Sequence, residues 1–143
     1  MDRASFILCA LAPAQNAAHT PVQVQKLIFL LDRNIASYVQ GPLFHFEPYH
    51  YGPFDREVYS TLEQLAMDDM VEIGMEPLGR WNIYRLTQKG QQKGEGLLNS
   101  FPLEVKRFIS NISGFVRQLS FTDLVSAIYK AYPEMKVNSV FQG

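Results

Sequence analysis

The sequence has little that would suit a disulfide-bonded, membrane-spanning or secreted protein. Its 143 residues include one cysteine, which cannot form a disulfide within the chain or a zinc site built from several cysteines. The longest uninterrupted apolar run covers residues 6–12, far short of the roughly 20 residues needed to cross a bilayer. No basic and apolar signal pattern opens the chain. We therefore expect a cytoplasmic protein without membrane contact.

The net charge is also small, at −1, which argues against a protein dedicated to binding polyanions. The two parts of the chain nevertheless differ. Residues 1–79 hold four Lys or Arg against ten Asp or Glu, a net of −6, whereas residues 80–143 hold nine against four, a net of +5. Because 47% of the residues are hydrophobic, the chain can bury a substantial core. We expect a single domain over residues 1–143 with an acidic side and a basic side.

Apolar residues recur at the spacing of a helical face through most of the chain. The predicted helices cover residues 2–13, 21–40, 55–69, 88–98, 102–119 and 120–132. The helix at 88–98 is weakened by Gly90, Gly94 and Gly96. Phe121 is placed on the apolar face of the last helix.

Two stretches predict extended structure. Residues 70–74 and 81–86 alternate apolar and polar side chains on either side of a turn containing Pro77 and Gly79, which indicates a β-hairpin. Residues 41–54 hold three prolines and two glycines, which exclude a helix, and a short strand is predicted at 43–47.

The order of three helices followed by a hairpin predicts an α-rich α+β fold, a winged helix-turn-helix with a two-stranded wing. Residues 1–90 would form the winged-helix core, and residues 91–143 would be a helical extension packed on it. The helix at 55–69 would occupy the recognition position. The stretch YRLTQKG at 84–90 is similar to the exit after the wing in many winged-helix proteins.

Part of the chain resembles a known bacterial family. The segments that carry the resemblance are VQKLIFLL at 24–31, FEPYHYGPF at 46–54, VY at 58–59, YP at 132–133 and VNSV at 137–140. They resemble the YwgA-like proteins, which look related to the Panacea domain of SocA-like antitoxins. Panacea-type chains usually carry a tryptophan where Tyr49 stands, so the YwgA-like resemblance is the better of the two. The resemblance implies a non-enzymatic regulatory or adaptor module of bacterial or phage origin.

The residue patterns give little support for catalysis, and we expect neither an enzyme nor a cofactor. Cys9 lies within an apolar helix, which favours a buried structural thiol over a nucleophile. The cluster His45, Glu47 and His50 is the best metal candidate, but His50 lies beyond Pro48. The ordinary interpretation is that these histidines are hydrogen-bonded at a loop surface, and metal binding is the alternative.

Protein binding is the leading functional hypothesis. The helix at 55–69 carries five acidic residues against Arg56 alone, and it directly follows the aromatic stretch 41–54. Aromatic anchors surrounded by charges are typical of protein interfaces. We expect Phe44, Phe46 and Phe54 to fill the interior. The candidate residues for a protein partner are Tyr49, His50, Tyr51, Arg56, Glu57 and Glu63.

The alternative is a DNA-binding transcriptional regulator that uses the basic wing. Residues 80–93 carry four cations and no acid, which suits phosphate contact. The acidic helix at 55–69, with a net of −4, would repel phosphates. Such a regulator would form a homodimer through residues 102–132, and head-to-tail self-association of acidic helix and basic wing is a further alternative. The candidate residues for DNA are Arg80, Arg85, Lys89 and Lys93.

Overall fold

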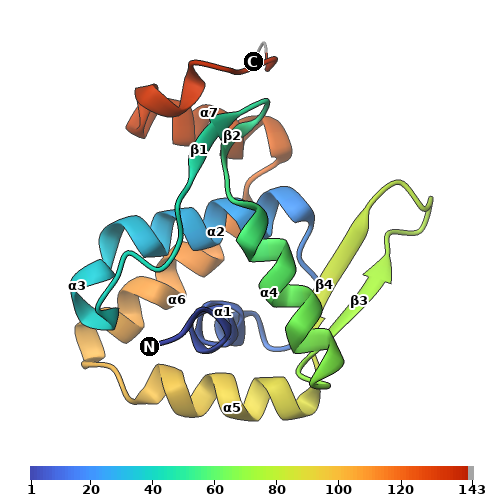
Figure 1. Cartoon of the computed structure of the whole chain (residues 1–143), viewed down its shortest axis with the longest axis vertical. Helices are drawn as coiled ribbons and strands as arrows, with labels where there is room; N and C mark the ends of the chain where they lie inside the picture. Colours follow the sequence, from blue (N-terminus) through green and yellow to red (C-terminus); the bar gives the residue numbers. More distant parts are fainter. Residues whose placement is uncertain (142–143) are drawn as a thin grey trace.

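The computed structural model describes residues 1–141, and within that range the chain is helix-rich with two small antiparallel sheets, an α+β fold (Figure 1). The helices are α1 (Arg3–Leu11), α2 (Pro21–Asn34), α3 (Ala36–Val39), α4 (Arg56–Met67), α5 (Gln88–Asn99), α6 (Leu103–Gln118) and α7 (Phe121–Ala131). The strands are β1 (Glu47–Tyr49), β2 (Gly52–Phe54), β3 (Val71–Met75) and β4 (Asn82–Leu86). Two short 3-10 helices, η1 (Ala12–Ala14) and η2 (Pro133–Lys136), complete the described elements.

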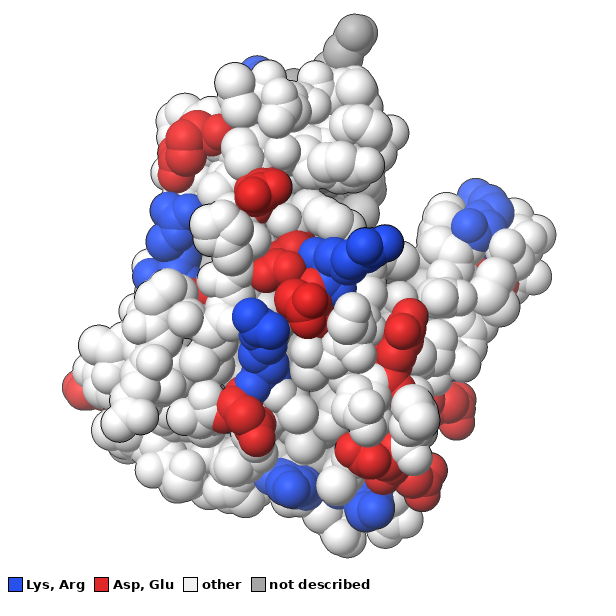
Figure 2. All heavy atoms as spheres, in the orientation of Figure 1, with Lys and Arg blue, Asp and Glu red and all other residues white. Residues whose placement is uncertain are grey.

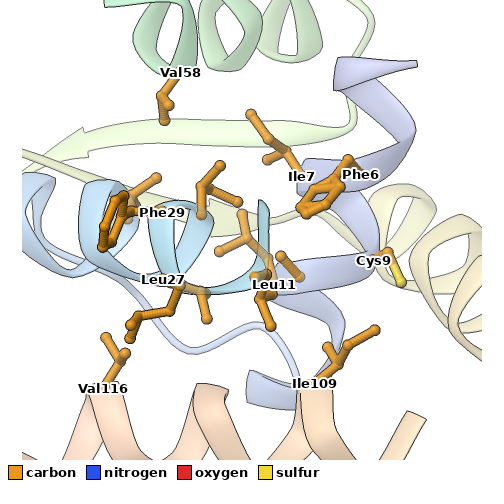
Figure 3. Packing of buried hydrophobic residues seen from close by; sticks show 14 of the residues in the cluster. Phe6, Ile7, Cys9, Leu11, Leu27, Phe29, Val58, Ile109 and Val116 are labelled. Atoms are coloured by element: carbon orange, nitrogen blue, oxygen red, sulfur yellow. The ribbon is translucent and has the colours of Figure 1, made fainter. Parts of the chain in front are cut away.

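Helix α1 lies at the centre, with α2, α4, α5 and α6 around it (Figure 1). Its residues 6–11 are all buried, because a helix that is apolar on nearly every side must be covered on every side. Figure 3 shows side chains from α1, α2, α4 and α6 pointing into one shared interior. Asp2 caps α1 by accepting a hydrogen bond from the backbone N–H of Ser5 at 2.7 Å.

Helix α5 forms despite its glycines, and two of them allow close packing. A Cβ on Gly94 would lie 2.5 Å from the carbonyl oxygen of Leu8 in α1, and a Cβ on Gly90 would lie 2.0 Å from that of Met70. The propensity cost of these glycines in a helix is therefore offset by the approach that they permit. Gly96 faces open space and has no such role.

The helix predicted over 21–40 is broken, and the break has a local cause. A capping box between Thr20 and Gln23 starts α2 as expected. At its end, the side-chain amide of Asn34 donates a hydrogen bond to the carbonyl oxygen of Leu30 at 2.7 Å. A side chain that bonds to the backbone in this way competes with the helical ladder. The chain leaves the helix at Ile35 and resumes only as the single turn α3.

The strand predicted at 43–47 is wrong, and a hairpin stands a few residues later. β1 and β2 pair antiparallel, with Glu47 opposite Phe54 and Tyr49 opposite Gly52. Gly52 has a φ of 106°, a conformation that suits glycine in this tight turn. The backbone N–H groups of Leu43 and Phe44 are instead bound by the carboxylate of Asp32, so they cannot join a sheet.

The second hairpin lies where it was predicted, within one residue at each strand end. β3 and β4 pair antiparallel from Val71 opposite Leu86 to Met75 opposite Asn82, and this hairpin projects from the helical body (Figure 1). The β1–β2 hairpin extends in another direction and is covered by α7 and η2. Residues from both hairpins and from the start of α2 line one cleft. Among residues 1–141, no helix combines the length and hydrophobicity needed to cross a lipid bilayer.

Candidate functional site

Three buried polar side chains on α2 fix the backbone that leads to the β1–β2 hairpin and α4. Gln25 both accepts from the N–H of Asp55, at 3.0 Å, and donates to its carbonyl oxygen, at 2.9 Å. Lys26 donates from Nζ to the carbonyl oxygen of Pro53 at 3.1 Å. Asp32 accepts from the N–H groups of Leu43 and Phe44. Buried polar groups of this kind stabilise a fold only when they are bonded, so they specify where this segment lies.

Lys26 is unusual among these residues because it buries a charged end. Its side chain is only 3% exposed, and burial lowers the pKa of its amine to about 7. The depressed pKa follows from removing an ammonium group from water without a carboxylate beside it. The root of the β1–β2 hairpin therefore contains an amine that changes charge near neutral pH.

The six residues predicted to bind a protein divide between two places. Tyr49, His50 and Tyr51 are exposed at the tip of the β1–β2 hairpin. Arg56, Glu57 and Glu63 are exposed on α4. Of the phenylalanines expected inside, Phe44 is buried, whereas Phe46 and Phe54 are half-buried.

The tip of the hairpin has two sides. The rings of Tyr49 and His50 stack with centroids 4.2 Å apart, and the carbonyl oxygen of His50 accepts from the N–H of Val140 at 3.0 Å. Tyr51 contacts the ring of Phe121 instead, edge to face, at 5.3 Å. Tyr51 thus belongs to a different surface from its two neighbours.

That surface is an aromatic cleft with a volume of about 590 Å³, lined by Thr20, Pro21, Val22, Tyr51, Trp81 and Phe121. Figure 2 shows the hollow between the projecting β3–β4 hairpin and the upper part of the molecule. Tyr51, Trp81 and Phe121 come from three separate elements, and each keeps 39–45% of its surface exposed. Large apolar side chains gathered in a concavity are the usual form of a binding site.

Two of these three aromatic residues, Trp81 and Phe121, were not among the binding residues predicted from the sequence. Phe121 was expected to be buried, but as the first residue of α7 it points away from that helix's buried stripe and is half exposed. Trp81 precedes β4, and the guanidinium of Arg80 lies 4.3 Å from its ring centroid. The signal available in the sequence was the position of the only tryptophan beside a turn.

Two of the four cations predicted to contact DNA lie beside acidic side chains of the same hairpin. Glu72 lies directly opposite Arg85 in the hairpin register, with carboxylate and guanidinium 3.8 Å apart. Arg80 binds both carboxylate oxygens of Glu76, at 3.0 and 3.1 Å, and these hydrogen bonds hold the pKa of Glu76 down at about 2. Residues 80–93 contain no acid in sequence, but β3 and the residue after it supply Glu72 and Glu76.

The other two cations predicted to contact DNA, Lys89 and Lys93, lie near the base of the β3–β4 hairpin. Lys89 donates to the carbonyl oxygen of Asp68 at 3.2 Å. Lys93 lies on α5 close enough to Asp2 to lower the pKa of that carboxyl, after the larger effect of the Ser5 hydrogen bonds. The four predicted residues therefore spread over the hairpin and α5, each beside an acidic residue or its backbone.

The face that carries α4 is acidic. Figure 2 shows acidic side chains spread over α4 and the adjoining base of the hairpin. Glu63 lies near β4, where it adds to the effect of burial in raising the pKa of Tyr84. Among the described residues, Arg3 pairs with Glu57 at 3.5 Å, while no salt bridge is present at Glu63, Asp68 or Asp69. The exposed surface of α4 is therefore mainly negative.

The proposed metal and thiol residues are separate from the cleft. His45 Nε2 lies 3.6 Å from Glu47 Oε1 on the surface, while His50 stacks on Tyr49. Within residues 1–141, no three side chains of the types that bind metal come together. Cys9 is buried in α1, and burial raises the pKa of its thiol to about 12.

Comparison of the chain with known protein families, with curated proteins and with solved structures gives no match.

Proposed function

We propose that this chain is a non-enzymatic winged-helix module whose partner is a protein bound in the aromatic cleft and along the acidic face of α4. The observation that carries the proposal is the convergence of Tyr51, Trp81 and Phe121, three half-exposed aromatic side chains from three elements, on one cleft. Aromatic residues contribute most of the binding energy in protein interfaces, and charged residues at the rim set specificity. The antitoxin- or adaptor-like role implied by the YwgA-like resemblance is of the same kind.

The winged-helix assignment rests on element order and packing. Helices α1, α2 and α4 precede the β3–β4 hairpin, and α4 contacts both α1 and β3. In this interpretation α4 is the recognition helix and β3–β4 is the wing. Helices α5 and α6 close the core around α1, so they are integral to the module rather than an appendage.

A protein fits the cleft better than a reacting substrate. No carboxylate, histidine, lysine or cysteine is among the described residues that line it. Lys26 and Cys9, whose pKa values are shifted, are buried elsewhere. These are the side chains that most often carry general acid–base and nucleophilic chemistry, and the Thr20 hydroxyl in the cleft is engaged in capping α2.

DNA binding through the wing is the weaker candidate. The carboxylates of Glu76 and Glu72, which lie beside Arg80 and Arg85, weaken the attraction of these two arginines for phosphates. The acidic side chains of α4, in the recognition position, would add repulsion.

Affinity purification from the native cell tests the proposal. We expect a partner that the wild-type chain captures to be lost with the double variant Tyr51→Ala/Trp81→Ala, and to be weakened by Glu57→Lys/Glu63→Lys. Leu78→Ala is the matched control, because Leu78 is an exposed apolar residue of the same hairpin that does not line the cleft. Equal capture by the wild type and by both double variants would refute the proposal.

A further inference from the structure

The outer edge of β4 is already used once for strand pairing. The backbone of Tyr84 donates to the carbonyl oxygen of His19 at 3.0 Å and accepts from its N–H at 2.8 Å. Because the N–H of Tyr84 is committed to His19, it is not bonded to Ile73, the residue opposite it in the hairpin. Tyr84 therefore turns its backbone groups away from β3.

The same must hold for Asn82, two residues along β4. Bonded and non-bonded pairs alternate in an antiparallel ladder, so the Met75–Asn82 pair is non-bonded, like the Ile73–Tyr84 pair. The bond from the N–H of Glu76 to the carbonyl oxygen of Trp81, at 3.0 Å, agrees with this register. The N–H and C=O of Asn82 thus face the outer edge, and within residues 1–141 they have no partner there.

The chain cannot fill this edge itself. After pairing at His19, it turns at Thr20 into α2, and the next residue, Pro21, has no N–H to donate. The edge left open at Asn82 adjoins Trp81, Pro21 and Val22, which line the aromatic cleft. An unpaired strand edge and an apolar recess thus lie side by side.

From this geometry we infer that the partner presents an extended segment, which continues the His19 pairing along the edge of β4 and inserts an apolar side chain into the aromatic cleft. This inference rests on the proposed function and specifies its ligand. In strand addition of this kind, main-chain hydrogen bonds supply affinity, and pockets for alternate side chains supply specificity.

The charges next to this edge define the rest of the segment. Tyr59 of α4 stacks on Tyr84 of β4 with ring centroids 6.1 Å apart, which places α4 beside this strand. Glu63 lies one helical turn further along α4, and no salt bridge neutralises it among the described residues. The nearby cations Arg80 and Arg85 are each within 4 Å of a carboxylate of the same hairpin. The side chains that flank the inserted apolar residue should therefore be Lys or Arg.

Defined peptides test this inference on the intact chain. The probe is acetyl-Lys-Val-Lys-Phe-Lys-Val-Lys-amide, and one control carries Glu in place of every Lys. A second control is methylated on alternate backbone nitrogens, which removes the donors on one edge. Trp81 is the only tryptophan, so its fluorescence reports occupancy of the cleft directly. We expect the Lys peptide to bind about tenfold more tightly than either control, the loss expected for removal of one to two hydrogen bonds or for reversed charge.

Variants at Asn82 separate the backbone from the side chain. Asn82→Pro removes the edge N–H and should weaken the Lys peptide about tenfold, whereas Asn82→Ala keeps the backbone and should change its affinity less than twofold. Proline is tolerated on strand edges, and circular dichroism checks that the hairpin persists. If Asn82→Pro unfolds the hairpin, the methylated peptide on the wild-type chain still decides the matter.

The outcomes distinguish this inference from the proposed function. Binding that Phe121→Ala abolishes but that neither methylation nor Asn82→Pro weakens would overturn strand addition and leave the cleft as the binding site. Equal binding of the Glu peptide would overturn the basic segment. If none of the peptides changes Trp81 fluorescence up to millimolar concentration, the strand-addition inference fails, while partner capture by the cleft is judged separately by purification.

Discussion

The amine of Lys26 lies 3.1 Å from the carbonyl oxygen of Pro53, so that a buried amine joins α2 to the β1–β2 hairpin. The packing around this bond is tight. A Cβ on Gly52 would lie 3.3 Å from Cε of Lys26 and 3.5 Å from the ring of Tyr129. The β1–β2 hairpin, which places Tyr51 in the cleft, is therefore held by the Lys26 amine, whose charge depends on pH.

Stability should rise with pH because of Lys26. Burial lowers its pKa to about 7 in the folded chain, below the usual value of 10.5 that applies when the chain is unfolded. Between these two values the unfolded state binds a proton that the folded state does not, so the free energy of unfolding increases with pH across that window, by a few kcal/mol. Below pH 7 both states hold the proton, and this group adds no further dependence.

Urea unfolding at pH 6 to 10 measures this effect. Lys26→Met should remove the rise, whereas Lys93→Met, at an exposed position on α5, should retain it. A Lys26→Met variant with the same pH dependence as the wild type would show that the amine is not the source.

Two glycines of α5 should respond oppositely to alanine. Gly94→Ala places a methyl group 2.5 Å from the carbonyl oxygen of Leu8 and should destabilise the fold by about 1–3 kcal/mol, the usual cost of overpacking. Gly96→Ala meets nothing within 4 Å and should stabilise it by up to about 1 kcal/mol through helix propensity. Thermal or urea unfolding of both variants checks the pair, and destabilisation by Gly96→Ala would contradict the packing described for α5.

Duplex DNA should bind weakly, if at all. We expect a gel-shift salt series on random duplex to give no tight complex at physiological ionic strength, because Arg80 and Arg85 are paired and α4 is acidic. Replacing Arg80, Arg85, Lys89 and Lys93 together by alanine should leave partner capture through the acidic α4 face in place. Strong binding that collapses with salt, and that the fourfold variant loses, would favour the regulator instead.

Local signals in the sequence predicted most of the fold. The capping side chains of Asp2, Thr20, Asp55 and Thr87 each accept a hydrogen bond from a backbone N–H within three residues. The helix starts can therefore be predicted from local spacing alone. The β1–β2 hairpin was missed because its position depends on Gln25, Lys26 and Asp32, which reach it from another helix. Such distant bonds leave no periodicity in the segment that they hold.

The site was less predictable than the fold for a related reason. Trp81 and Phe121 are separated by forty positions, and only tertiary packing brings them together beside Tyr51. The basic character of the β3–β4 hairpin was inferred from residues 80–93 alone, whereas Glu72 and Glu76 lie beside two of its arginines in the fold. Tyr51 could be identified because its polar tip and its place in a turn both favoured exposure.

The central position of α1 has a consequence for synthesis. Its principal neighbour α5 follows it by more than seventy residues, so the ribosome makes the most apolar helix of the core long before the helix that packs on it most extensively. Until α6 has been synthesised, the apolar surface of α1 is not completely covered. Contacts between residues so far apart in the chain form late. A chain that ends before α5 therefore leaves exposed the apolar face of α1 that α5 covers.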